Sequence, residues 1–297
     1  MNLRDYLHSC YISEDLTSVI MSILKAGKEI SEKIKNVDIG TAGTENIYGE
    51  EQMALDVLSD KIFQQELKSN RNVGLIASEE LHDEIKIGDG NYAVCYDPLD
   101  GSSLIDTNLS VGSIFSIYES SSFIGVAGKD QLVAGFIVYG PRLTLIISVS
   151  HGTIECSYKD NEWLVTKDNL IVSEGKMFAP GNLRIISERD DYMKLMEFWM
   201  KNGYTLRYSG GMVPDINQIF LKGKGIFIYP GCPSKPEGKL RLLFECAPMA
   251  FLMEQAKGIA TDGNARILDK VIQSIDQKSP IYLGSIEEVK RVQTYLS

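Results

Sequence analysis

The chain has 297 residues, a length that suits one large domain or two of ordinary size. Hydrophobic residues make up 44% of it, and the formal net charge is −10. No stretch approaches the roughly 18–20 apolar residues of a membrane helix, the first residues lack the pattern of a secretion signal, and no block of Lys and Arg suits a phosphate backbone. We therefore expect a globular cytoplasmic protein that binds neither membranes nor nucleic acids.

The first part of the chain predicts two helices joined by a loop. Apolar residues recur at helical spacing from Asp15 to Lys35 and again from Glu51 to Lys68. Residues 39–50, rich in Gly and Thr, separate the two patterns. A connection of this composition is a candidate mobile lid.

Short apolar runs follow, and they predict strands. Several are joined too closely for a crossover helix, so we expect a largely antiparallel sheet. The runs are Val73 to Ala77, Tyr92 to Tyr96, Ser113 to Tyr118, Leu132 to Tyr139 and Leu143 to Val149.

Beyond residue 173 the patterns of helix and strand mix. Residues 192–201 and 247–256 predict helices, and residues 225–229 predict a strand. We place a boundary near residue 173, which gives an N-terminal α/β domain (1–173) and a C-terminal α/β domain (174–297). The two would share one cleft.

Carboxylates gather where the apolar segments end, and strand ends are where α/β proteins display their chemistry. Asp97 directly follows a predicted strand, and we expect Pro98, which has no N–H, to end the ladder there. Asp100 can then turn back towards the same point. The carboxylates at such junctions are Glu50, Asp56, Glu79, Glu80, Asp97, Asp100 and Glu245.

A cluster of oxygen ligands suits Mg²⁺ or Mn²⁺, whereas zinc would recruit His or Cys, and the three histidines lie away from these motifs. Two cations about 3.5–4 Å apart could bind a phosphate oxygen, activate a water and stabilise the leaving alkoxide. The alternative is that Asp97 and Asp100 only form an Asx turn and that Glu79 and Glu80 are a solvated strand end.

The second half of the chain supplies candidate cations. Arg207 suits bidentate capture of a phosphate, and Lys239 would act as a point charge. If residues 238–245 form a strand, alternation puts Lys239, Arg241 and Glu245 on one face. The alternative is that Lys239 and Arg241 are surface cations on an edge strand.

Four motifs carry most of this chemistry: DPLDGSS at 97–103, SEE at 78–80, GEEQMALDVLSD at 49–60 and GKLRLLFECAPMA at 238–250. Together they resemble the fructose-1,6-bisphosphatase and sedoheptulose-1,7-bisphosphatase family, over nearly the whole chain. A lone DPxDG would also admit the inositol monophosphatases, but those do not carry RYSGGMVPD (207–215) and KLRLLFE (239–245).

The resemblance implies a layered α-β-α-β-α sugar-phosphatase fold with mixed, largely antiparallel sheets. It also implies a homodimer or homotetramer that removes the 1-phosphate of a ketose bisphosphate, using two or more Mg²⁺ ions for which Mn²⁺ can substitute.

The resemblance further implies a role for each matching residue. Asp56 and Glu80 would orient and deprotonate the attacking water, and Glu50 would reach a metal from the lid. The metal ligands would be Glu79, Asp97, Asp100, Glu245 and the main-chain carbonyl of Leu99.

The remaining matches would bind substrate. Asp100 and the donors that follow it would hold the 1-phosphate, and residues of the second half would hold the sugar and its distal phosphate. The first group continues with Gly101, Ser102 and Ser103, and the second comprises Asn182, Arg207, Tyr208, Gly211, Met212, Tyr229, Lys239 and Arg241.

The identity of the sugar rests on shorter stretches. Residues 175–184, 204–219 and 261–270 resemble the sedoheptulose enzymes, whereas FIYP at 227–230 resembles the fructose enzymes. We expect hydrolysis of sedoheptulose 1,7-bisphosphate, with fructose 1,6-bisphosphate as a second substrate. The alternatives are a fructose-1,6-bisphosphatase of gluconeogenesis, an inositol-type monophosphatase and a sugar-phosphate sensor without catalysis.

Overall fold

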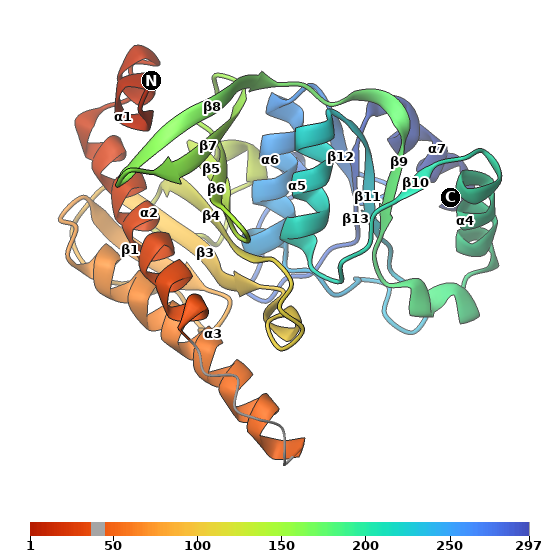
Figure 1. The fold of residues 1–297 in the computed structure, drawn as a ribbon, viewed down its shortest axis with the longest axis horizontal. Coiled ribbons are helices and arrows are strands. Elements are labelled where there is room, and N and C mark those ends of the chain that lie inside the picture. Colours follow the sequence, from red (N-terminus) through yellow and green to blue (C-terminus); the bar gives the residue numbers. More distant parts are fainter. Residues whose placement is uncertain (37–44, 297) are drawn as a thin grey trace.

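The computed structural model describes residues 1–36 and 45–296, with side chains from Leu55 onward in the second range. Its helices and sheets alternate in five layers, α-β-α-β-α, which confirms the predicted fold class (Figure 1). Within the described residues, no helix combines the length and apolar character needed to cross a bilayer. The helices are α1 (Leu3–Ser9), α2 (Glu14–Lys35), α3 (Glu45–Lys68), α4 (Asp190–Lys201), α5 (Met212–Lys222), α6 (Ala247–Gln255) and α7 (Ile286–Leu296).

The first sheet has eight strands in the order β2-β1-β3-β4-β5-β6-β7-β8. All neighbours are antiparallel except β1 and β3, as the short connections predicted. The strands are β1 (Val73–Ser78), β2 (Ile85–Lys86), β3 (Tyr92–Asp100), β4 (Val111–Glu119), β5 (Val133–Tyr139), β6 (Leu143–Ser148), β7 (Thr153–Lys159) and β8 (Glu162–Leu170).

The second sheet has five strands in the order β10-β9-β11-β13-β12. β9 pairs in parallel with β10 and β11, and the other pairs are antiparallel. The strands are β9 (Ser173–Pro180), β10 (Thr205–Leu206), β11 (Lys224–Tyr229), β12 (Ile259–Thr261) and β13 (Ile281–Gly284).

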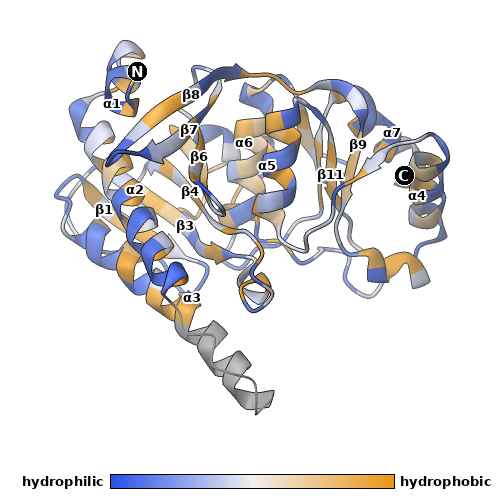
Figure 2. Cartoon of the chain, viewed as in Figure 1, coloured by the Kyte–Doolittle hydropathy of each residue, from blue (hydrophilic) through white to orange (hydrophobic). Residues whose placement is uncertain are grey.

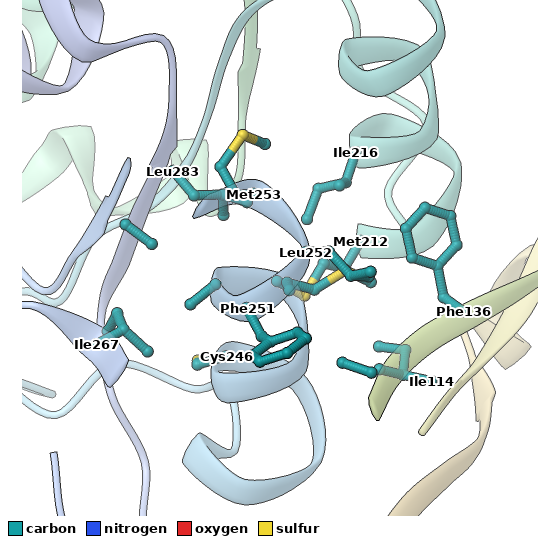
Figure 3. Packing of buried hydrophobic residues seen from close by; sticks show 14 of the residues in the cluster. Ile114, Phe136, Met212, Ile216, Cys246, Phe251, Leu252, Met253, Ile267 and Leu283 are labelled. Carbon is teal, nitrogen blue, oxygen red and sulfur yellow. The ribbon is translucent and has the colours of Figure 1, made fainter. Parts of the chain in front are cut away.

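Helices α5 and α6 form the middle layer, between the two sheets. Residues 247–253 of α6 are all apolar and all buried (Figure 2). Figure 3 shows Leu252 and Phe251 of α6 between Ile114 and Phe136 of the first sheet and Leu283 of the second. One continuous hydrophobic core therefore joins the two sheets through these helices.

The outer layers cover the remaining faces of the sheets. α1, α2 and α3 pack on the first sheet, with Ile20 and Ile23 of α2 and Phe63 of α3 fully buried. α4 and α7 pack on the second sheet around Trp199, whose indole N–H donates to Glu288 at 2.8 Å. The amphipathic spacing read from the sequence thus matches the faces that the helices bury.

The second helix begins earlier than its apolar pattern indicated. α3 starts at Glu45, so residues 45–50, which we expected in the loop, belong to the helix. Residues 39–44 of the predicted lid lie outside the described residues. The lid therefore stays a prediction for that stretch.

The prediction that Pro98 ends its strand is wrong. β3 runs on to Asp100 because it contains a bulge: Asp97 pairs with Ile114 and Asp100 with Gly112, so β3 has one more residue than β4 over this stretch. The extra residue of a bulge does not have to donate its N–H to the neighbouring strand, so proline is tolerated there. The carbonyl of Pro98 accepts a hydrogen bond from Ser113 Oγ at 2.7 Å, which also joins the bulge to β4.

The prediction of a strand over residues 238–245 is also wrong. Residues Leu242–Cys246 form a single π-helical turn that leads directly into α6. The apolar run after Arg241 is buried in the middle layer, where helical backbone satisfies its own hydrogen bonds. Alternation along a strand therefore does not place Lys239, Arg241 and Glu245 on one face.

Candidate active site

Three carboxylates converge between the first sheet and the middle layer. Asp97 and Asp100 come from the bulged end of β3, and Glu245 comes from the π-helical turn before α6. Ligand oxygens of these three residues all lie within 4.8 Å of one another. The structure thus brings together residues that are far apart in the sequence.

Hydrogen bonds fix the orientation of this carboxylate cluster. Asp97 Oδ1 accepts from the N–H of Leu99 at 2.9 Å, so the predicted Asx turn exists, but it coexists with the cluster. Asp100 Oδ2 accepts from the N–H of Val213 at 2.7 Å, in the first turn of α5. Glu245 Oε2 accepts from the N–H of Arg241 at 2.5 Å. Each carboxylate is therefore held by a backbone donor.

Burial and mutual repulsion make the ionised cluster unfavourable. Burial, followed by the nearby charge of Glu79, raises the pKa of both Asp97 and Glu245 well above the usual range. Burial also raises the pKa of Asp100 to about 6, although the backbone donors of Val213 and Met212 oppose this. A cation would stabilise this arrangement because it would offset the repulsion.

Two further acidic residues follow β1, at the edge of the same cluster. The pKa of Glu79 is raised mainly by burial, and the guanidinium of Arg241, whose Nε lies 3.7 Å from Glu79 Oε1, opposes the shift. The pKa of Glu80 is raised by burial and then by the charge of Asp60.

Asp56 of α3 faces these residues from the outer helical layer. Burial, and next the charge of Glu80, raise the pKa of Asp56 to about 6. Its Oδ1 atom is buried without a hydrogen-bond partner among the described residues. Such a carboxylate is suited to accept a proton near neutral pH.

The carboxylate cluster lies in one cleft of about 860 Å³. The lining includes most of the residues predicted for the site, drawn from both halves of the chain. These are Asp56, Glu79, Glu80, Asp97, Leu99, Asp100, Gly101, Ser102, Ser103, Asn182, Tyr208, Gly211, Met212, Tyr229, Lys239 and Glu245. Gly101 has a φ of 80°, a left-handed conformation that suits glycine and turns the chain into the short 3-10 helix Ser102–Leu104.

Two predicted residues whose side chains the structure describes, Arg207 and Arg241, do not line this cleft. The guanidinium of Arg241 contacts Glu79 and Asp276 instead. Arg207 follows β10, and one of its amino groups donates to the carbonyl of Leu206 at 3.3 Å. The side chain of Glu50 lies outside the described residues.

The cleft also contains polar residues that were not among the predicted site residues. Arg184 and Lys235 add two cations, and Glu188 and Asp215 add two carboxylates. Asp215 is buried and accepts from the N–H of Ser209 at 3.0 and 3.1 Å. The sequence offers one signal for Lys235: it is a cation in a loop rich in Pro and Gly (231–238). Loops that are held by a rigid scaffold often line binding sites.

The donor set fits a hard divalent cation. All of the converging ligands are oxygens and none is His or Cys, which is the preference of Mg²⁺ and Mn²⁺ rather than zinc. The raised pKa values of the cluster and the unpartnered oxygen of Asp56 are consistent with positive charge at this place.

Comparison with known proteins decides the family. The model of the fructose-1,6-bisphosphatase N-terminal domain matches residues 5–168, and the model of its C-terminal domain matches residues 171–297. The chain belongs to the fructose-1,6-bisphosphatase family. It is thus a sugar bisphosphatase, a phosphoric monoester hydrolase of a metal-dependent family, which separates it from the monophosphatase and sensor alternatives.

Relatives within the family carry both substrate names. The fructose-1,6-bisphosphatase class 1 of Syntrophotalea carbinolica is 46% identical, over 100% of this chain and 93% of that protein. The chloroplastic sedoheptulose-1,7-bisphosphatase of Spinacia oleracea is 39% identical, over 99% of this chain and 78% of that protein.

Solved structures show the same division. A Toxoplasma gondii protein assigned as a sedoheptulose-1,7 bisphosphatase superposes with a TM-score of 0.92 at 32% identity, covering 100% of this chain and 99% of that one. Leishmania major fructose-1,6-bisphosphatase in its holo form gives 0.89 at 31% identity, with the same coverage.

Proposed function

We propose that the protein is a Mg²⁺-dependent phosphatase that removes the 1-phosphate of sedoheptulose 1,7-bisphosphate and accepts fructose 1,6-bisphosphate in the same cleft. One observation carries the proposal: a carboxylate cluster and three cations, Arg184, Lys235 and Lys239, line a single cleft of about 860 Å³. Metal-assisted hydrolysis of a dianionic ester needs both of these features.

The oxygen ligands support Mg²⁺, in two or more copies and with Mn²⁺ as a substitute. Asp97, Asp100, Glu245 and Glu79 would hold the ions, together with the carbonyl of Leu99. Bound Mg²⁺ would supply the Lewis acidity that polarises the phosphate and acidifies a bound water.

The remaining roles fall to side chains at the cluster. Asp56, with a pKa of about 6, accepts the proton of the attacking water, and Glu80 orients that water. Gly101, Ser102 and Ser103 offer backbone N–H and hydroxyl donors to the 1-phosphate at the turn that follows β3.

The sugar is the finer part of the proposal. Asn182 and Arg184, from the stretch that resembles the sedoheptulose enzymes, both line the cleft. Fructose 1,6-bisphosphate as the main substrate is the alternative, and it is favoured by several similar relatives, which are bacterial fructose-1,6-bisphosphatases at 42–46% identity. We therefore propose dual activity rather than exclusion of the six-carbon substrate.

The test is phosphate release by the purified protein with Mg²⁺. We expect turnover of both bisphosphates, with the larger kcat/KM for sedoheptulose 1,7-bisphosphate. Turnover of fructose 1,6-bisphosphate alone would establish the alternative. Addition of EDTA should abolish release, and Mn²⁺ should restore part of it.

Two structural predictions accompany the function. We propose a homodimer or homotetramer, which size-exclusion chromatography with light scattering would measure. We also propose the domain boundary near residue 173, which limited proteolysis would locate by cleavage close to that position.

A further inference from the structure

Three cations line the cleft, and they differ in how close they lie to the carboxylate cluster. Lys239 is near it, because Arg241, two residues further on, donates its N–H to Glu245 at 2.5 Å and places its guanidinium 3.7 Å from Glu79. The charge of Lys235 acts instead on Glu188, at another part of the lining. Neither lysine is in an ion pair with any residue that the structure describes. Both side chains are exposed, so both charges are available to an anionic ligand, at different parts of the lining.

The backbone of Lys235 is fixed by a tight turn. Its N–H donates to the carbonyl of Cys232 at 2.9 Å, and its own carbonyl accepts from Cys232 at 3.1 Å and from Gly238 at 3.1 Å. The side chain is exposed, so the turn fixes only the backbone of this lysine. The turn sets the point from which the ammonium group reaches into the cleft.

Glu188 anchors this turn to the opposite segment of the rim. Its Oε2 accepts from the N–H of Ser234 at 3.1 Å, and its Oε1 accepts from Ser234 Oγ at 2.9 Å. These hydrogen bonds lower the pKa of Glu188, so the carboxylate is ionised at neutral pH. We name the Glu188–Ser234 contact the rim latch.

The rim latch joins two segments that both present cations to the cleft. Glu188 directly follows the short 3-10 helix Leu183–Ser187, which carries Arg184. Ser234 precedes Lys235 in the turn. A second tie, from Arg189 Nη1 to the carbonyl of Gly231 at 3.2 Å, holds the same two segments together. The separation of Arg184 and Lys235 is thus fixed by contacts outside the carboxylate cluster.

We propose that Lys235 determines substrate chain length, by binding the distal phosphate of the seven-carbon bisphosphate, and that Glu188 is a positioning residue that holds it there. The inference rests on the proposed function. With the 1-phosphate held at the carboxylate cluster, a substrate longer by one carbon carries its second phosphate further along the cleft, past Lys239 and towards Lys235. A dianion at that place needs its own cations, and Lys235 supplies one as a point charge.

The experiment measures kcat and KM with Mg²⁺ on sedoheptulose 1,7-bisphosphate, fructose 1,6-bisphosphate and fructose 1-phosphate. The test variants are Lys235→Ala and Glu188→Ala, and the conservative variants are Lys235→Arg and Glu188→Asp. Lys194→Ala is the matched control, because Lys194 is an exposed lysine of α4 that does not line the cleft.

Lys235→Ala should raise KM about tenfold for the seven-carbon substrate and about threefold for the six-carbon substrate, as an exposed charge-assisted contact is lost. The kcat should stay within about twofold, and fructose 1-phosphate, which has no distal phosphate, should be turned over as by the wild type. Glu188→Ala should show the same pattern with smaller changes, and the conservative variants and the control should resemble the wild type.

Wild-type rates test the proposed function, and ratios of variant to wild type test the inference. Absence of wild-type turnover of the seven-carbon substrate refutes the function, whatever the variants do. Equal losses on all three substrates would make Lys235 a structural residue and overturn the inference. Equal losses on the two bisphosphates alone would overturn the assignment of chain length.

Discussion

Replacing Asp100 with Asn should make the metal-free protein more stable while removing its activity. Asn has nearly the same shape, and its side-chain oxygen can still accept from the N–H of Val213, which Asp100 now does at 2.7 Å. What disappears is one negative charge beside Asp97 and Glu245. Stability and activity should therefore change in opposite directions.

The magnitude follows from the pKa of Asp100, which burial raises from 3.8 to about 6. A rise of this size corresponds to about 3 kcal/mol of stability lost when the group ionises in the folded state. Because the carboxylate is partly accessible to solvent, we expect about 1–2 kcal/mol. The cost is present above the folded pKa and fades as the pH falls to the unfolded value. The variant should thus exceed the wild type in stability at pH 7.5, and the difference should vanish near pH 4.

Urea denaturation in EDTA at the two pH values measures this difference, and addition of Mg²⁺ at pH 7.5 should reverse it by stabilising the wild type more than Asp100→Asn. Phosphate release should fall at least a hundredfold in the variant, as expected when a metal ligand is lost. If the two proteins unfold at the same urea concentration at pH 7.5 without metal, Asp100 carries no electrostatic cost and the reasoning is wrong.

Asp56→Asn should lower kcat about a hundredfold or more with little change in KM, since a general base acts on the transition state; a defect confined to KM would make Asp56 a binding residue. Gly112→Ala should destabilise the protein by about 2 kcal/mol or more, because the new Cβ would lie 2.4 Å from the backbone oxygen of Ile137. An unchanged urea midpoint would contradict this. Trp199→Phe removes a donor at 2.8 Å from the buried carboxylate of Glu288 and should cost about 1 kcal/mol, measured by the same denaturation. Loss of enzyme activity at unchanged stability would instead link this outer layer to catalysis.

The sequence predicted the outer helices α2, α3 and α4 from their regular apolar periods, and β1, β3, β4, β5, β6 and β11 from their apolar runs, but it did not predict α1, α5, α7 or the other strands. It failed at the apolar run after Arg241, where a short buried strand and a buried helical turn have the same composition. The π-helical turn depends on how α6 packs between the two sheets, which is a tertiary property. The same limit applies to Pro98: whether a proline ends a strand or occupies a bulge depends on the neighbouring strand, here through Ser113.

The acidic part of the site was easier to predict than the cationic part. Asp97 and Asp100 lie at the end of a strand that its apolar run predicts, so their place in the fold follows from the backbone pattern. The backbone of Lys235 is positioned by a turn and by the hydrogen bond of its neighbour Ser234 to Glu188 of a distant segment, and neither leaves a periodic signal. Arg207 has the right chemistry for a phosphate, but chemistry alone does not say which way an edge segment directs its side chain.

Because the carboxylate cluster combines residues from both halves of the chain, we expect enzyme activity to require that both halves have folded and packed together. Asp97 and Asp100 belong to a sheet that is complete by Leu170, whereas Glu245 and the backbone donor of Val213 are synthesised later. Neither half can form the site alone, however well it folds. Phosphate release by separately produced fragments, divided near residue 173, would therefore measure how well the fragments reassociate. During synthesis, the site could form only after Glu245 had left the ribosome.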